Sequence, residues 1–251
     1  MSSPQSFADH FSSKAASYSQ YRPGYPRELF AWLASLCPVH QRVWDCATGT
    51  GQAAAQFTPH FELVIASDAS FAQVSKAATE GQYLRTSCLA EQTPFVDDCF
   101  DLVTVAQALH WFDLDRFYTE VKRVLKPDGV LAVWSYGLMQ IAPPLDSIVN
   151  HLYHHTVGPY WPFERKQVEN GYRDLAFPFN ELSSPVFSMQ ADWSVQHLLG
   201  YLSTWSAVKR YKEDRGVDPL QSISHDLLTA WGEQQTRTVT WPLALRVGTQ
   251  S

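Results

Sequence analysis

The chain has 251 residues, 45% of them hydrophobic, and a formal net charge of −6 at pH 7, a size and apolar content suited to one α/β domain over residues 1–251. Its lysines and arginines form no run, which argues against a nucleic-acid partner, because phosphate binding needs clustered cations. No apolar stretch approaches the ~20 residues of a membrane span, and the polar start lacks a signal-peptide pattern, so we expect a cytoplasmic monomer or homodimer whose partner is a small molecule.

Two helices are predicted before the first strand. Apolar and aromatic side chains recur at helical spacing from Phe7 to Tyr18, which predicts an N-terminal helix with one apolar face. Pro26 is suited to the first position of a second helix, and Pro38 ends it. This N-terminal part is expected to cover the domain core.

Strands and helices then alternate up to residue 137. The predicted strands are 42–46, 62–67, 82–87, 100–106 and 129–135, and the predicted helices run to 57, over 70–79 and over 114–125. Such alternation is typical of a parallel sheet that is covered by helices on both faces. Residues 1–137 are therefore interpreted as a cofactor-binding core of Rossmann-like α/β type. The run Lys126-Pro127-Asp128-Gly129 is interpreted as a turn that leads into the last of these strands.

The alternation stops beyond Gly137. Residues 138–183 combine five prolines with many aromatic residues, which predicts an irregular, partly helical insertion, interpreted as a substrate lid. Residues 184–251 are expected to complete the domain with a strand near 185–191, helices from 194 and 218, and an extended run over 236–247.

A glycine loop follows the first predicted strand. Asp45 ends that strand, and Gly49 and Gly51 lie in the loop, where glycine allows the backbone to pass close beneath a ligand. The next strand ends at Asp68, whose carboxylate is placed to accept two ribose hydroxyls. The same loop matches the dinucleotide fingerprint Gly-x-Gly-x-x-Gly/Ala, so a nicotinamide-dependent oxidoreductase is the alternative reading.

Asp45 favours a cationic ligand over a dinucleotide. An acid four residues before Gly49 would lie beside the pyrophosphate of a dinucleotide and repel it. S-adenosylmethionine has an adenosine, no phosphate and an amino-acid tail with an ammonium group. Acids at the ends of both strands therefore favour S-adenosylmethionine as the cofactor.

The motifs resemble those of the class I S-adenosylmethionine-dependent methyltransferases. The resemblance lies in Asp45-x-Ala47-x-Gly49-x-Gly51, Asp68, Pro94-Phe95, Phe100-Asp101-Leu102-Val103, Gln107 to Phe112, and Leu125 to Gly129. The runs Tyr21 to Pro26, His110 to Asp113 and Tyr201 to Ser206 look like the small-molecule branch that includes trans-aconitate methyltransferase. The resemblance implies a seven-stranded, mostly parallel sheet whose last strand is antiparallel and at or next to the edge.

Two residues depart from the family pattern. Ala47 replaces the usual first glycine, and Leu89 stands where many relatives carry an acid that contacts the adenine amino group. These departures leave a non-catalytic cofactor-binding protein as a further alternative.

The resemblance and the strand ends together give a set of candidate site residues. Because ligands bind beyond the carboxyl ends of the strands in open parallel sheets, the expected cofactor-binding residues are Tyr18, Arg22, Asp45, Ala47, Thr48, Gly49, Gly51, Asp68, Ala69, Ala90, Glu91 and Gln107. Tyr21, Trp111, Trp161, Trp205 and Arg210 are expected to line the acceptor site. No metal site is predicted.

His110 is the candidate general base. It follows the fourth strand, and the ordinary pKa range of histidine suits proton transfer near neutral pH. Its alternative role is to orient Trp111 or close the loop. A carboxylic acid acceptor would need no base, whereas a hydroxyl or carbon acid would need one. The predicted reaction is methyl transfer to a small molecule, with a carboxylic acid as the first candidate acceptor.

Overall fold

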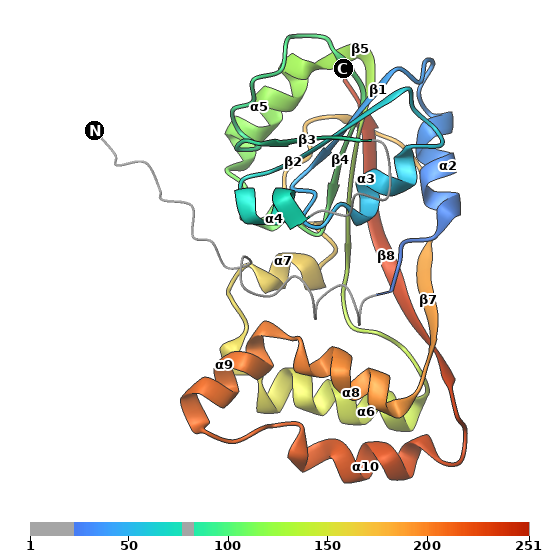
Figure 1. Ribbon diagram of the computed structural model, residues 1–251, viewed down its shortest axis with the longest axis vertical. Coiled ribbons are helices and arrows are strands. Elements are labelled where there is room, and N and C mark those ends of the chain that lie inside the picture. The colour runs from blue at the N-terminus through green and yellow to red at the C-terminus, as the bar shows by residue number, and fades with distance from the viewer. Residues whose placement is uncertain (1–22, 77–82, 251) are drawn as a thin grey trace.

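The computed structural model describes residues 23–76 and 83–250, and it has the predicted α/β architecture (Figure 1). The predicted N-terminal helix, with Tyr18, Tyr21 and Arg22, lies outside the described residues, as do the last positions of the helix predicted over 70–79. The first described helix, α2, covers Arg27–Ser35, and the preceding Pro26 is its N-cap residue.

Eight strands form the sheet. They are β1 Arg42–Cys46, β2 Leu63–Asp68, β3 Leu84–Ser87, β4 Phe100–Ala106, β5 Leu125–Tyr136, β6 Asn180–Glu181, β7 Ser188–Trp193 and β8 Arg237–Thr249. Their order is β3-β2-β1-β4-β5-β8-β6, and β7 pairs with β8 off this path. β1 to β5 are parallel, whereas β8 runs antiparallel to β5, β6 and β7. The Rossmann-like, mostly parallel sheet is confirmed, with one more strand than the family pattern and its antiparallel last strand next to the edge.

Helices cover both faces of the sheet (Figure 1). α2 and α3, Gln52–Phe57, lie on one face, and α5, Leu114–Val124, lies on the other. The alternating direction of side chains along β1 places Val43 in the core cluster that contains α2 and Trp44 in the cluster that contains α5. Both side chains are fully buried, which explains why the parallel strands read as continuous apolar runs.

The predicted turn at Lys126-Pro127-Asp128-Gly129 interrupts the register of β5. Opposite β4, the pairing passes from Leu125 directly to Val130, so the residues between them bulge out of the ladder. From this position the Lys126 Nζ forms an ion pair with the carboxylate of the buried Asp101 at 2.6 Å. Asp101 also accepts hydrogen bonds from the backbone N–H groups of Gln41 and Arg42. This network fastens the amino ends of β1, β4 and β5 together, opposite the edge where the candidate site lies.

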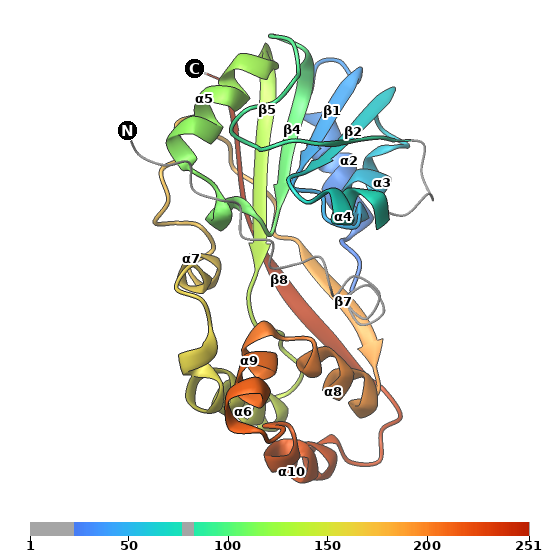
Figure 2. The ribbon, with the colours of Figure 1, turned by 60° about the vertical axis from the view of Figure 1, so that its left-hand side comes forward.

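Four helices gather beyond the carboxyl ends of the parallel strands. They are α6 Pro143–His151, α8 Val195–Ser203, α9 Ser206–Arg215 and α10 Gln221–Trp231, and the long β8 with β7 connects them to the sheet (Figure 2). The short α7, Arg165–Glu169, lies between these helices and the sheet in both views (Figures 1 and 2). The segment 138–183 therefore contains α6 and α7 as well as β6. Within residues 23–76 and 83–250, no helix is both long and apolar enough to cross a bilayer.

Gly171 fixes the segment after α7 against the sheet, and a larger residue there should destabilise the fold. Its φ is +61°, and a Cβ at this position would lie 2.6 Å from the Cβ of Ala244 in β8. We expect Gly171→Ala to lower the free energy of unfolding by about 1–3 kcal/mol, because backbone strain and overpacking add. Chemical denaturation would measure this change.

Gly216→Ala is the matched control for that experiment. Gly216 also has a positive φ of +70°, but an added Cβ would meet no atom within 4 Å. The Gly216 variant should lose less stability than the Gly171 variant. Equal losses in the two variants would mean that the contact with Ala244 contributes nothing.

Candidate functional site

The loop between β1 and α3 forms the floor of the candidate site. Ala47 and Gly49 both have left-handed backbone conformations, with φ values of +53° and +57°, and Gly51 at the start of α3 has a φ of +83°. The Thr48 N–H donates to the carbonyl of Ser67 at 2.8 Å, which holds the loop against the end of β2. A Cβ added to Gly49 would meet nothing within 4 Å. The loop therefore leaves open space above Gly49, where a ligand can approach the backbone.

Asp68 links the end of β2 to this loop. One carboxylate oxygen accepts the N–H of Gly49 at 2.9 Å, and the other accepts the N–H of Ser70 at 2.9 Å. The acid predicted to bind ribose is thus already oriented by two backbone groups. A carboxylate has about four acceptor positions, so these two bonds do not exhaust it.

Asp45 is a fully buried carboxylate at the end of β1. It accepts hydrogen bonds from the hydroxyls of Thr48 at 2.5 Å and Thr104 at 2.9 Å, and Thr104 faces it across the β1–β4 ladder. Burial and the nearby charge of Asp68 raise its pKa to about 6, although these hydroxyls and the N–H of Ala54 act in the opposite direction. None of the ion pairs formed by the described residues includes Asp45. A cation bound beside it would favour its charged form.

Gln107 occupies a strained position at the end of β4. Its φ is +58°, and its backbone N–H donates to the carbonyl of Trp134 at 2.9 Å. Its side-chain amide donates to the carbonyl of Tyr136 at 2.8 Å. The two bonds hold this residue in the left-handed region at the same sheet edge as Asp45.

Ala90 and Glu91 lie in the loop that follows the carboxyl end of β3. Ala90 is buried, and the carboxylate of Glu91 accepts the N–H of Asp113 at 3.0 Å, just before α5. The structure therefore gives Glu91 a loop-anchoring contact and places Ala69 beside Asp68.

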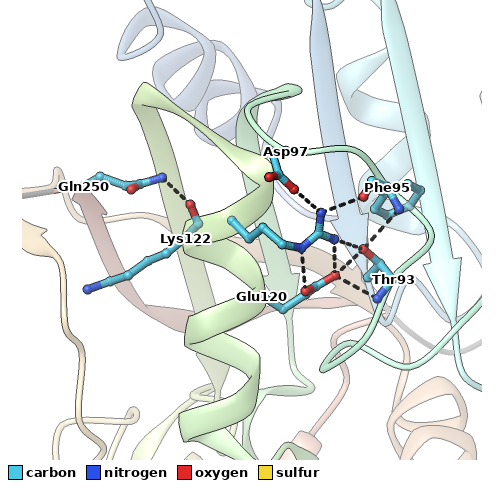
Figure 3. A network of polar contacts seen from close by, with 7 residues as sticks. Thr93, Phe95, Asp97, Glu120, Lys122 and Gln250 are labelled. Atoms are coloured by element: carbon cyan, nitrogen blue, oxygen red, sulfur yellow. Dashed lines mark hydrogen bonds and ion pairs between the residues drawn. The ribbon is translucent and has the colours of Figure 1, made fainter.

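An arginine on α5 holds the rest of that loop (Figure 3). Arg123 bonds to Glu120, to Asp97 at 2.6 Å and to the carbonyl of Phe95 at 2.8 Å, and these three partners are labelled in the view. Thr93 also donates to Glu120. Burial raises the pKa of Glu120, but the bonds from Arg123 and Thr93 outweigh it and bring the pKa to about 2. The network fixes the loop that carries Ala90 and Glu91 against α5.

His110 lies in the short helix η1, Leu109–Trp111, directly after β4. Its Nδ1 is 2.9 Å from the hydroxyl oxygen of Tyr172, a residue that is 1% exposed. Burial raises the pKa of Tyr172, while the nearby backbone N–H groups of Leu109 and His110 act in the opposite direction. Because these N–H groups approach the oxygen as donors, we expect the Tyr172 proton to be directed at Nδ1 and the imidazole proton to lie on Nε2. Burial, with a smaller effect from the charge of Arg165, lowers the pKa of His110 to about 3.

We expect His110 to stay neutral from about pH 8 to about pH 5. Folding lowers its pKa, so below about pH 6.5 the folded state binds fewer protons than the unfolded state, and this residue reduces stability as the pH falls. Nitrogen NMR of histidine-labelled protein would show the Nε2–H form throughout. Tyr172→Phe should leave the pKa of His110 well below its ordinary value, because burial and the charge of Arg165 remain. A wild-type titration near pH 6.5 would contradict this and favour a role as general base.

The predicted acceptor residues occupy two different surroundings. Trp111 is 39% exposed, and its ring lies 4.8 Å from that of His110. The ring centres of Trp161 and Trp205 lie 5.6 Å apart, and both rings pack against Tyr153 in an aromatic cluster. Arg210 is exposed on α9 and donates to the carbonyl of Tyr160 at 3.2 Å. The structure thus joins Trp161 and Trp205 and gives Arg210 a contact with a backbone carbonyl.

Three residues of this region were not predicted. Thr104 binds Asp45, Tyr172 binds His110, and Arg165 influences the pKa of both His110 and Tyr172. Thr104 has a signal in the sequence, since it is a polar residue inside the apolar run of β4. Tyr172 and Arg165 lie in the irregular segment after residue 137 and have no such signal.

Comparison with known proteins agrees with this geometry. A family model described as a methyltransferase domain matches residues 44–133, which span β1 to β5. A Dictyostelium discoideum protein assigned as a methyltransferase is 34% identical over 96% of this chain and 94% of its own length. The chain belongs to the class I methyltransferases. A solved structure from Anaeromyxobacter dehalogenans, assigned as a type II methyltransferase, is 42% identical and covers 91% of this chain and 98% of its own, with a TM-score of 0.87.

A third relative of this methyltransferase matches about half of the chain. A Saccharomyces cerevisiae protein described as a probable S-adenosylmethionine-dependent methyltransferase is 30% identical over 49% of this chain and 45% of its own length. Within residues 23–76 and 83–250, no group of three or more histidine, cysteine or acidic side chains is arranged to hold a metal ion.

Proposed function

We propose that this methyltransferase uses S-adenosylmethionine to methylate a small molecule, with a carboxylic acid as the acceptor. The observation that carries the donor assignment is Asp45, a fully buried carboxylate beside the glycine loop with a pKa raised to about 6. The ammonium group of the donor's amino-acid tail would stabilise its charged form, whereas a pyrophosphate would add a second negative charge. The description of the yeast relative names the same donor.

Different residues at the sheet edge would bind different parts of the donor. Asp68 would accept the ribose hydroxyls, and Ala69 with Ala90 would line the adenine. The open backbone at Gly49 would lie beneath the adenosine, and Gln107 would border the methionine part. Leu89 is 45% exposed and supplies no acid for the adenine amino group. Tyr18 and Arg22 belong to the proposed site by sequence.

The state of His110 favours an acceptor that needs no base. The donor supplies an activated methyl group on a sulfonium sulfur. A carboxylate oxygen bonds to the methyl carbon while the carbon–sulfur bond breaks, its electron pair goes to sulfur, and the products are a methyl ester and a neutral thioether. No proton moves in this step. A neutral histidine with a pKa of about 3 suits this chemistry as a positioning group beside Trp111.

A methyl-transfer assay with a trideuteromethyl donor would test this function. We expect mass spectrometry to detect labelled methyl esters from a panel of small carboxylic acids, and less product from matched phenols and amines. Donor binding without transfer to any member of the panel would favour the non-catalytic alternative. Stabilisation by NAD(P) alone in a thermal-shift titration would favour the oxidoreductase instead.

A further inference from the structure

Arg165 is a half-buried cation on α7 that forms no ion pair with an acid of residues 23–76 or 83–250. Its Nε donates to the hydroxyl of Tyr153 at 2.7 Å, and its guanidinium carbon lies 5.6 Å from the centre of the Tyr153 ring and 5.0 Å from that of Trp161. No hydrogen bond or ion pair of the described residues uses its two terminal amino groups. Two aromatic faces therefore hold the guanidinium while the end of its fork stays available for a ligand.

The acid on the same helix is bound to a different group. Glu169 lies one turn after Arg165 on α7, but its carboxylate accepts the hydroxyl of Tyr153 at 2.5 Å and forms no ion pair with Arg165. Tyr153 accepts from Arg165 and donates to Glu169. The hydroxyl thus connects the two charged groups and fixes the direction of the guanidinium.

Arg165 lies next to the sheet edge where the methyl donor is proposed to bind. α7 packs against η1, which carries His110, and after burial the charge of Arg165 is the second cause of the lowered His110 pKa. Figures 1 and 2 place α7 between the carboxyl ends of the strands and the outer helices. The donor side of this region carries Asp45 and Asp68, and the α7 side carries Arg165. This separation of charge suits a cationic donor and an anionic acceptor.

We propose that Arg165 binds a carboxylate of the methyl acceptor, flanked by the rings of Tyr153 and Trp161. The inference rests on the proposed function. A planar guanidinium fork matches a carboxylate with two parallel hydrogen bonds, and one positive charge balances one negative charge. A phosphate monoester carries close to two negative charges and would be balanced less well.

Binding and kinetics of three variants test this proposal. The probes are phenylacetate, glutarate and citrate, the primary amides of the first two, and phenyl phosphate, each titrated into protein loaded with S-adenosylhomocysteine. The variants are Arg165→Gln, Arg165→Lys and, as the control, Arg173→Gln. Arg173 is an exposed arginine of the same segment whose Nε donates to the carbonyl of Asn170.

We expect at least one of the acids to bind the wild-type protein. The amides of phenylacetate and glutarate should bind at least tenfold more weakly than the corresponding acids. Arg165→Gln should weaken acid binding at least tenfold and raise KM more than it lowers kcat. Arg165→Lys should recover part of the affinity, and Arg173→Gln should match the wild type. Unchanged affinity for S-adenosylhomocysteine in all variants would show that the fold and the donor site are intact.

Several results would overturn the role of Arg165 while leaving the methyltransferase function in place. One such result is equal acid binding by the wild type and Arg165→Gln. The others are a preference for the amides or phenyl phosphate, and binding of no acid by the protein loaded with S-adenosylhomocysteine. Failure of the protein to bind S-adenosylhomocysteine would instead contradict the proposed function itself.

Discussion

Asp68→Ala is expected to weaken S-adenosylhomocysteine binding about 10- to 150-fold. This range corresponds to the loss of charge-assisted hydrogen bonds worth about 1.5–3 kcal/mol. The variant also removes the acceptor of the Gly49 and Ser70 N–H groups, so the glycine loop loses its connection to the end of β2. Calorimetric titration would measure the affinity, and denaturation would measure the accompanying loss of stability.

A second variant and a second ligand make this result specific. Glu62→Ala removes an exposed acid next to the opposite end of β2 and should leave the affinity unchanged. Methylthioadenosine keeps the ribose but lacks the amino-acid tail, so Asp68→Ala should weaken its binding by a similar factor. An unchanged affinity for either ligand in Asp68→Ala would show that the ribose does not bind at this carboxylate.

Asp45→Asn is expected to change stability and donor affinity in opposite directions. Folding raises the pKa of Asp45 from 3.8 to about 6, so between these values the folded state holds more protons than the unfolded state. The free energy of unfolding of the wild type therefore falls as the pH rises through this window, by about 3 kcal/mol in total. Asparagine does not ionise, and the hydroxyls of Thr48 and Thr104 can rotate to bind it. The variant should gain stability relative to the wild type by this amount between about pH 4 and about pH 7.

The same variant should bind the donor more weakly. Without the charge beside the ammonium group, we expect Asp45→Asn to bind S-adenosylhomocysteine at least tenfold more weakly at about pH 7.5. The wild-type affinity should fall below about pH 6, whereas the affinity of the variant should not change there. Methylthioadenosine has no ammonium group, so its affinity should not change.

Asp101→Asn is the matched control. Asp101 is equally buried, but it is paired with Lys126 at the opposite end of the strands. Its substitution should lower stability and leave donor affinity unchanged. If the free energy of unfolding of Asp45→Asn did not rise relative to that of the wild type between pH 4 and pH 7, the ionised Asp45 would not destabilise the fold as proposed.

Much of the sheet could be predicted from local sequence. The apolar run that ends at Asp45 is buried on both faces, and the run that ends at Asp68 is buried or partly buried throughout, so both runs are continuous and easy to recognise. The positions of Gly49 and Gly51 were informative because their positive φ values favour glycine. Ala47 adopts a similar conformation without being glycine, which explains how the loop keeps its shape despite the departure from the family pattern.

The surroundings of the acceptor could not be predicted in the same way. His110 has an ordinary place after β4, but its pKa is lowered by burial and by the charge of Arg165, and its ring is bound by Tyr172, and both of these residues come from a segment far away in sequence. The role proposed for Arg165 depends on its contacts with the rings of Tyr153 and Trp161. Such contacts are formed by the tertiary fold of an irregular segment, and neither periodicity nor spacing encodes them.

Calorimetric titration of the whole chain with S-adenosylhomocysteine, and separately with NAD⁺ and NADP⁺, tests the role of the acidic sheet edge most directly. We expect S-adenosylhomocysteine to bind at one site, more tightly at about pH 7.5 than at about pH 5 because Asp45 ionises near pH 6, and the dinucleotides not to bind. Binding of NAD⁺ or NADP⁺ by a protein that does not bind S-adenosylhomocysteine would contradict the account.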